Sequence, residues 1–235
     1  MPILIEKFDK DLDEIHQSDI SSHSKNIILT PFYDVYQIDI CEYLTGDYSG
    51  IVLINYLGYE RADWILSALD DFQEKYPEKT SLELFNHMQE LVNFNDPELV
   101  GCVAFKNYHD SVVSGAQIKA AFVQKDHQRH EIATKTYVIL MDKYGAVISD
   151  GTQTPLAQKL WALSLPKYGD VSIYNSQHKR FLSQQIPQNK MAIWSIPVSD
   201  PNHFNIHVNV TSNNLDQYLS EHDCCQHVLL VLKHS

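Results

Sequence analysis

A polar segment near the middle of the chain has the residue types and the order of an anion-binding site. Residues 120–134 read AAFVQKDHQRHEIAT, so an apolar run is followed at once by charged and polar side chains. This pattern predicts a strand that leads through a short loop into a helix, Ile132 to Tyr144, which ends at Gly145. The leading N–H groups of a helix lack partners within it and carry the positive end of its dipole. The loop and the start of the helix are therefore expected to hold an anionic group.

This segment resembles the coenzyme-binding loop of the GNAT superfamily of N-acetyltransferases. In that superfamily a strand-to-helix loop with the pattern Gln/Arg-x-x-Gly-x-Gly/Ala wraps the pyrophosphate of acetyl-coenzyme A (acetyl-CoA). Gln128, Ile132 and Ala133 match the pattern. Glu131 stands where the family has its close-approach glycine, and Arg129 stands where many members have another glycine. The resemblance implies that acetyl-CoA is the cofactor.

A second stretch further along the chain extends the resemblance. Residues 143–155 read KYGAVISDGTQTP and residues 159–161 read KLW, an order that looks like the corresponding run of GNAT-like acyltransferases from phage and prophage genomes. The resemblance implies an α/β fold with a GNAT-like mixed central β-sheet flanked by helices and a β-rich C-terminal extension. It also implies transfer of an acetyl group from acetyl-CoA to an amine acceptor, with direct attack of the amine on the thioester.

The residues that the resemblance implies for coenzyme binding come from the end of the strand and from the loop. They are Phe122, Val123, Gln128, Arg129, His130, Glu131, Ile132 and Ala133. A glycine in place of Glu131 would let the backbone approach the pyrophosphate, whereas a carboxylate adds bulk and negative charge beside a dianion. Coenzyme binding is therefore expected to be weakened. Arg129 and His130 would offset part of this loss by contacting phosphate, although an Arg–Glu pair would serve equally to fix the loop.

Two further residues are candidates for a catalytic role because of where they end strands. Ligands in open α/β sheets lie beyond the carboxyl ends of parallel strands, which are expected here near Val123 and Ser149. Asp150 is the first candidate for an acid, a base or a substrate contact, and its alternative role is to cap a turn or helix. Tyr174 is a candidate proton donor, and its alternative role is that of a packed strand aromatic with its hydroxyl at the edge.

The position of Trp161 leaves a noncatalytic function open. Many GNAT enzymes carry a tyrosine general acid at the place that Trp161 occupies by resemblance, and an indole does not supply that proton at neutral pH. Together with Glu131, this residue favours a rival hypothesis: a noncatalytic GNAT-like phage protein that binds a host protein partner. Such a protein would act through its acidic surface on a basic partner, and the binding would weaken with salt.

The histidines and cysteines do not predict a metal site. His203 and His207 have the i, i+4 spacing of helical zinc ligands, but apolar residues alternate around them as in a strand. No glutamate completes a His-Glu-x-x-His motif there. Cys224 and Cys225 are adjacent, which makes them awkward ligands for one ion.

The composition limits the class of protein. The chain has 18 Lys and Arg against 30 Asp and Glu, a net charge of −12. This acidity argues against a broad nucleic-acid-binding surface, because nonspecific affinity depends on cationic contacts to phosphates, and leaves a local basic patch open. No apolar run approaches the roughly 20 residues that span a bilayer, and the first residues lack the apolar block of a signal peptide. A cytoplasmic protein without membrane contact is expected, and four scattered cysteines fit a reducing compartment.

Residues 1–235 are expected to form a single GNAT-like domain, because no repeat or Gly/Ser-rich linker interrupts them. The recognisable core covers about residues 100–174, and residues 1–99 and 175–235 are expected to complete the fold. The apolar strand over residues 228–233 is expected to pair within the sheet or across a subunit contact, since an exposed strand would promote aggregation.

Helical periodicity and capping signals predict four further helices or helix starts. An amphipathic helix is expected over about residues 5–15 and should end at the Ser-rich stretch 18–24. A helix is expected over residues 65–76. A second helix should follow it and begin at a capping box formed by Thr80 and Glu83. The last helix starts at Thr154 and Pro155 and should end before Pro166, with Leu156, Leu160 and Leu163 on one face.

Alternating and apolar runs predict the strands. They cover residues 33–40, 51–57, 100–105, 112–123, 146–149, 171–174, 191–198, 204–210 and 228–233. A turn is expected over residues 107–110. Because helices separate the strands over residues 112–123, 146–149 and 171–174, successive members of this group are expected to be parallel neighbours.

Overall fold

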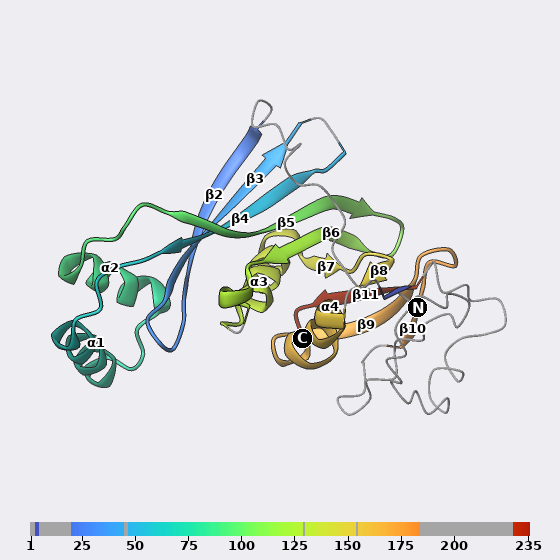
Figure 1. Cartoon of the computed structure of the whole chain (residues 1–235). Coiled ribbons are helices and arrows are strands. Elements are labelled where there is room, and N and C mark those ends of the chain that lie inside the picture. Colours follow the sequence, from blue (N-terminus) through green and yellow to red (C-terminus); the bar gives the residue numbers. More distant parts are fainter. Residues whose placement is uncertain (1–2, 5–19, 45–46, 129, 154, 184–227) are drawn as a thin grey trace.

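A nine-stranded β-sheet forms the centre of the molecule (Figure 1). The computed structural model describes residues 3–4, 20–44, 47–128, 130–153, 155–183 and 228–235. Across the sheet the strands follow the order β10-β9-β11-β7-β6-β5-β4-β3-β2, and every neighbouring pair is antiparallel except β6 and β7. The strands are β2 (Ile20–Leu29), β3 (Val35–Tyr43), β4 (Gly50–Leu57), β5 (Glu98–His109), β6 (Ser114–Val123), β7 (Ala146–Ile148), β9 (Asp170–Asn175), β10 (Arg180–Ser183) and β11 (Val228–Lys233). The predicted mixed α/β class is confirmed, with mostly antiparallel pairing.

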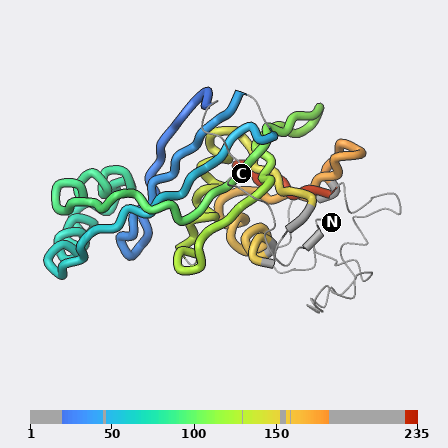
Figure 2. Tube along the Cα trace, turned by 45° about the horizontal axis from the view of Figure 1, so that its top comes forward, coloured from blue at the N-terminus to red at the C-terminus, as the bar shows by residue number. Residues whose placement is uncertain are grey.

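The helices of the described chain occupy separate places around this sheet. They are α1 (Asp63–Lys75), α2 (Ser81–Leu91), α3 (Ile132–Tyr144) and α4 (Pro155–Lys159). Figures 1 and 2 both show α1 and α2 together at one end of the molecule, away from α4. A separate two-stranded parallel sheet joins β1 (Ile3–Leu4) to β8 (Thr152–Gln153).

The strand β2 begins within the Ser-rich stretch that was expected to end a helix. Residues 20–24, which were predicted to end a helix, form the start of β2 and pair with β3. An edge strand leaves one side open to solvent, so serines are compatible with it. Ser21 Oγ donates to the Glu42 carbonyl oxygen at 3.1 Å, and Ser22 Oγ donates to the Glu42 carboxylate at 2.5 Å. The prediction was wrong because cross-strand bonds of this kind are not visible in local composition.

The helices α1 and α2 build a second hydrophobic cluster against the turn end of β2 and β3. Ile65 and Leu69 of α1 meet Leu84 and Met88 of α2 there. The predicted capping box is confirmed, since Thr80 Oγ1 accepts a hydrogen bond from the N3 backbone N–H and the N3 glutamate carboxylate accepts from the Thr80 N–H at 2.9 Å.

The helix α3 packs on one face of the sheet, and its bounds confirm the prediction. Gly145 ends it in the left-handed conformation, with φ +78°. Val147 of β7 and Tyr137 of α3 belong to the same buried cluster. Phe122 and Val147 lie on the neighbouring strands β6 and β7, which run parallel as predicted.

The strand β11 corrects the predicted order of the last strands. It lies between β7 and β9 and is antiparallel to both, so β7 and β9 are not neighbours. The expectation that each helix returns the chain to an adjacent parallel strand therefore holds for β6 and β7 and fails for β9. The intervening strand, β11, lies at least 53 positions further along the chain than the residues of β9 with which it pairs, and a prediction from consecutive elements does not include it. The predicted pairing of β11 within the sheet is confirmed.

The predicted last helix changes its geometry along its length. After α4 it continues as a π-helix over Leu160–Ser164 and a 3-10 helix over Leu165–Lys167, which contains Pro166. Pro166 does not end it because a proline near the start of a helix removes no hydrogen bond. Along the π-helix the buried side chains are Trp161 and then Leu165. Of the three leucines predicted to share one face, Leu160 packs against the main core, whereas Leu156 and Leu163 are exposed, so the predicted stripe is wrong for these two.

The turn between β5 and β6 lies later than expected. Residues 107–109 still belong to β5, and the chain reverses over residues 110–113. Asp110 Oδ1 accepts hydrogen bonds from the backbone N–H groups of Val112 and Val113, both at 2.8 Å. This side-chain turn, rather than composition alone, sets the position of the reversal.

Several predictions lie outside the described residues. They concern the helix over residues 5–15, the strands over residues 191–198 and 204–210, the His203/His207 spacing and the Cys224/Cys225 pair. In the described ranges, none of the helices has the length and apolar character needed to cross a bilayer.

Candidate functional site

The corner between β6 and α3 has the predicted strand, loop and helix. β6 ends at Val123, a 3-10 turn covers Lys125–His127, and α3 begins at Ile132. Gln128 Nε2 donates to the Val123 carbonyl oxygen at 2.9 Å, so this side chain closes the loop onto the end of the strand. Arg129 lies outside the described residues.

Glu131 occupies the position that most affects an anion at this corner. Its backbone is left-handed, with φ 56° and ψ 17°, a conformation that glycine adopts at no steric cost. Glu131 is the N-cap of α3, but its side chain makes no capping hydrogen bond. The N–H groups of the first turn of α3 are therefore not capped by this carboxylate. Tyr168 Oη donates instead to Glu131 Oε2 at 3.3 Å.

The other residues predicted to bind the coenzyme differ in the exposure of their side chains. Phe122 is 46% exposed, and Val123 is partly buried against the main core. Ile132 is 1% exposed, so its side chain belongs to the core. Its backbone N–H is the first one of α3. Ala133 is partly buried. The predicted contacts to an anion thus depend on backbone groups more than on apolar side chains.

The parallel strands β6 and β7 are paired over a short distance only. Ala116 pairs with Val147 and Gln117 with Ile148, after which β6 continues for six residues to Val123. The register with β5 shifts between Ala120 and Ile118, which leaves Lys119 as a bulged residue. Gln117 Nε2 donates to the Ser149 carbonyl oxygen at 3.3 Å, just beyond the paired positions. β7 ends at Ile148, so the carboxyl-terminal part of β6 continues toward the loop beyond the residues that pair with β7.

Asp150 lies two residues after the end of β7 and contacts Lys119, the bulged residue of β6. Its carboxylate forms an ion pair with Lys119, with a distance of 3.2 Å from Oδ1 to Nζ. The same oxygen accepts the Gly151 N–H at 2.9 Å. The side chains of Lys119 and Asp150 are 23% and 20% exposed, so the pair is accessible from one side. This geometry suits both of its proposed roles, a substrate contact and a turn cap.

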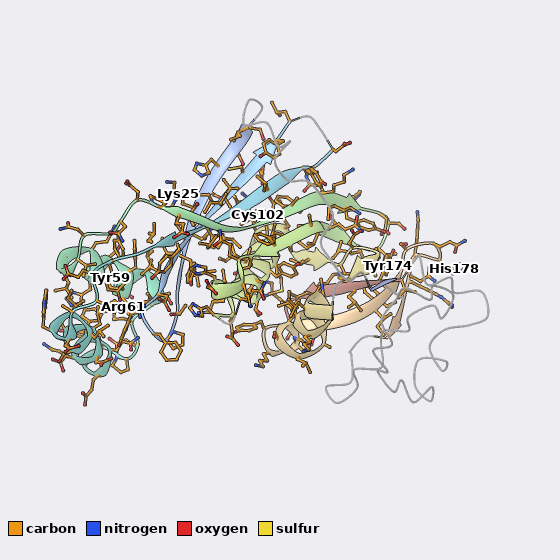
Figure 3. The ribbon with its side chains drawn as sticks, viewed as in Figure 1. Lys25, Tyr59, Arg61, Cys102, Tyr174 and His178 are labelled. Atoms are coloured by element: carbon orange, nitrogen blue, oxygen red, sulfur yellow. The ribbon has the colours of Figure 1, made fainter. Side chains whose placement is uncertain are left out.

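Tyr174 is not brought together with the loop. It belongs to a cluster with Ala146 and Ile148, on the face of the sheet opposite to Val147 and α3. Its hydroxyl donates to Asp110 Oδ2 at 2.6 Å, and burial followed by this hydrogen bond raises its pKa. Figure 3 shows Tyr174 and Arg61 toward opposite ends of the molecule. The structure thus gives the Tyr174 hydroxyl a fixed partner within the hairpin of β5 and β6.

A buried hydrogen-bond network beneath the loop was not predicted. Tyr36 of β3 is fully buried, and its hydroxyl contacts two ring nitrogens of the loop. The distance is 2.9 Å to His127 Nδ1 and 2.8 Å to His130 Nδ1. These contacts join residues 91 and 94 positions apart. No local motif marks Tyr36, because only the pairing of distant strands brings it under the loop.

Asp34 extends this network on the side of β3. His130 Nδ1 lies 3.5 Å from Asp34 Oδ2, and Arg61 pairs with Asp34 Oδ1. Thr30 Oγ1 donates to Asp34 Oδ2 at 3.2 Å. Burial raises the pKa of Tyr56, and the Asp34 carboxylate raises it further. The part of the chain before residue 100 therefore contributes buried polar groups to the site.

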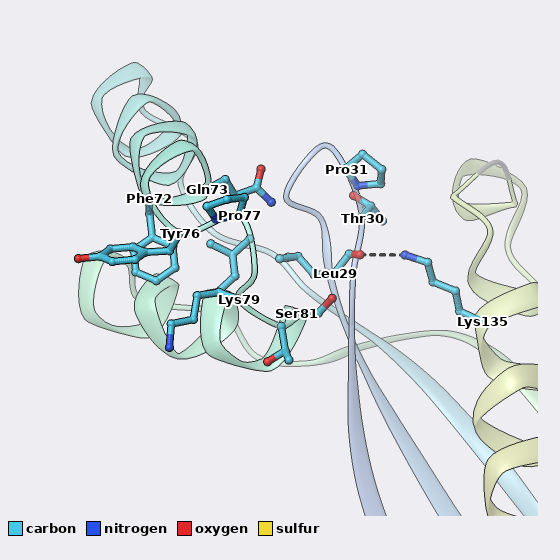
Figure 4. Close-up of a pocket in the computed structure, with 12 residues that line it drawn as sticks. Leu29, Thr30, Pro31, Phe72, Gln73, Tyr76, Pro77, Lys79, Ser81 and Lys135 are labelled. Atoms are coloured by element: carbon cyan, nitrogen blue, oxygen red, sulfur yellow. Dashed lines mark hydrogen bonds between the residues drawn. The ribbon is translucent and has the colours of Figure 1, made fainter.

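A pocket of about 370 Å³ lies beside the first turns of α3 (Figure 4). It is lined by the end of α1, the start of α2, the end of β2 and Lys135, whose Nζ donates to the Leu29 carbonyl oxygen at 2.9 Å. None of the residues predicted for coenzyme binding or catalysis lines it. Among the described residues, no group of three or more His, Cys, Asp or Glu is placed to hold a metal ion.

Comparison with known proteins gives no relative for this chain. It matches no protein-family model, no curated protein and no solved structure.

Proposed function

We propose that this protein is an acyl-CoA-dependent N-acyltransferase of the GNAT type. The observation that carries the proposal is the start of α3, where the N-cap side chain makes no capping hydrogen bond, after a strand that continues past the end of its parallel neighbour. The two stretches that resemble GNAT proteins fall on β6, the loop and α3, and then on β7 and α4. The strand, loop and helix that the resemblance predicts are therefore the elements that form the corner between β6 and α3.

The residues of the corner fit a pyrophosphate through their backbone. The N–H groups of Ile132, Ala133 and Thr134 at the start of α3 would hold it. Residues 124–135 carry three Lys or Arg against two Asp or Glu, so this segment is locally basic in a chain of net charge −12. Bound acetyl-CoA would supply the acyl group as an activated thioester. The Glu131 carboxylate opposes this binding and is the feature that a test should remove.

Asp150 is the residue we propose to act on the acceptor. The amine must lose a proton as its nitrogen forms the new amide bond and the thiolate leaves. Asp150 lies two residues after the end of β7, where its carboxylate could accept that proton or bind the amine. Lys119 orients the carboxylate through their ion pair.

The rival function is that of a noncatalytic GNAT-like protein that binds a host protein. Trp161 favours it, since this residue is 1% exposed and packs against Tyr137 with ring centroids 6.0 Å apart. A buried indole offers no proton to a leaving thiolate. Release of free thiol from acetyl-CoA in the presence of amines supports the enzyme. A stoichiometric protein partner whose binding weakens at high salt, with no thiol release, supports the rival.

Replacement of Glu131 by glycine is expected to tighten acetyl-CoA binding about fivefold, because a like charge near the anion is removed. Stability should change by less than about 1 kcal/mol, since relief of the left-handed strain is offset by the extra freedom of glycine in the unfolded chain. Calorimetric titration with acetyl-CoA and urea unfolding measure the two effects.

Glu131→Gln is the matched control for this change. It removes the charge and keeps both the bulk and the strained backbone. A gain in Glu131→Gly alone would assign the effect to backbone approach, and an equal gain in both would assign it to charge. Unchanged or weaker binding in both variants would show that the loop does not hold the pyrophosphate in the proposed way.

A further inference from the structure

The Tyr36 hydroxyl contacts one ring nitrogen of each of two histidines and makes a different kind of hydrogen bond to each. A hydroxyl has one proton to donate and lone pairs with which to accept. Both contacts are shorter than 3.0 Å, and a buried hydroxyl keeps its own proton in a hydrogen bond, so Tyr36 donates to one Nδ1 atom and accepts from the other. The two histidines are therefore held in opposite tautomers when both rings are neutral.

Asp34 decides which histidine carries the proton on Nδ1. Its carboxylate lies 3.5 Å from His130 Nδ1, so a proton on that nitrogen is favoured by the nearby negative charge. His130 then donates to Tyr36 Oη, and Tyr36 donates to His127 Nδ1. Burial, and next the charge of Asp34, raise the pKa of Tyr36, so its hydroxyl keeps the proton that it donates.

We propose that Tyr36 fixes His127 as the tautomer protonated on Nε2 and so makes it a hydrogen-bond donor to a phosphate group at the loop. With Nδ1 occupied by Tyr36, His127 presents only the N–H of its other ring nitrogen. His127 ends the 3-10 turn between β6 and α3 and is partly exposed. The phosphate contact rests on the proposed function, whereas the tautomer assignment stands on the hydrogen bonds alone.

The inference makes Tyr36 a positioning residue on β3. It acts on the loop through His127 and His130. Tyr56 also packs near His127, with ring centroids 5.2 Å apart, so the imidazole is confined on a second side. The strands before residue 100 would therefore be part of the anion site as well as of the scaffold.

Nitrogen-15 NMR of the histidine rings at about pH 8, where imidazoles are neutral, reads the tautomers directly. The signals are assigned with His127→Gln and His130→Gln. In the wild-type protein we expect His127 protonated on Nε2 and His130 on Nδ1. In Tyr36→Phe the signals of His127 should become those of a tautomer mixture. Tyr144→Phe is the matched control, because it removes a hydroxyl bonded to Glu42 at the other end of α3 and should leave both tautomers unchanged.

A wild-type His127 protonated on Nδ1, or a His127 spectrum that is the same in Tyr36→Phe, would overturn the assignment. If Tyr36→Phe does not fold, the wild-type spectrum decides alone, since the proposal requires opposite tautomers in a stated order. Titration with inorganic pyrophosphate then tests the contact. Binding should shift the His127 Nε2 signal and weaken about five- to tenfold in Tyr36→Phe.

Absence of any shift with pyrophosphate would refute the phosphate contact while the tautomers remain as assigned. Failure of acetyl-CoA to bind while pyrophosphate shifts His127 would instead refute the proposed function and leave an anion site of another kind. The two failures are therefore distinguishable.

Discussion

Deletion of residues 226–235 is expected to abolish soluble folded protein. The deletion removes β11, which lies between β7 and β9 and has six pairs with β9 and three with β7. Its residues Val228 to Leu232 are at most 5% exposed. Burial of five such side chains contributes on the order of 10 kcal/mol, which is comparable to the whole stability of a domain. Soluble yield and circular dichroism check the result.

Two further variants keep this prediction testable when the truncated chain cannot be purified. Leu230→Ala should lower the free energy of unfolding by about 2–5 kcal/mol, because it opens a cavity at a fully buried position. Deletion of only His234 and Ser235 should change stability by less than about 1 kcal/mol, because both are exposed and the contact that it removes, between His234 and Asp142, lies at the surface. A protein without residues 226–235 that retains its full melting temperature would show that β11 is dispensable.

The second large effect is expected for Gly115→Val. A Cβ atom at Gly115 would lie 2.4 Å from the Ala146 carbonyl oxygen, a backbone atom of β7. The two parallel strands would have to move apart, at a cost of about 3 kcal/mol. Urea unfolding measures this loss. Coenzyme binding should weaken as well, because the corner of β6 and α3 depends on this pairing.

Gly145→Ala is the control that introduces backbone strain without a steric clash. Gly145 has φ +78° and no atom within 4 Å of an added Cβ, so its replacement should cost only about 1 kcal/mol. Equal losses for Gly115→Val and Gly145→Ala would contradict the close approach of β6 to β7.

Local signals were sufficient for the elements that they control. The bounds of α3 follow from its apolar spacing and from Gly145, and the start of α2 follows from the Thr80 capping box. The strand β11 was predictable because its apolar run has to be covered. Each of these features is decided within about a dozen neighbouring residues.

Features that depend on distant pairing were not predictable in this way. The Ser-rich start of β2 is a strand because β3 pairs with it, and the place of β11 between β7 and β9 is set by the whole sheet. The π-helix after α4 moves the buried face away from the leucines. Tyr36 shows the same limit within the site, because its contacts to His127 and His130 join segments 91 and 94 positions apart in the sequence.

Calorimetric titration of the full-length protein with acetyl-CoA tests the central claim most directly. The proposal predicts saturable binding of one molecule per chain, with inorganic pyrophosphate as a competitor, because the start of α3 would hold the pyrophosphate. Absence of binding at millimolar acetyl-CoA, in the wild-type protein and in Glu131→Gly alike, would contradict an acyl-CoA-dependent function.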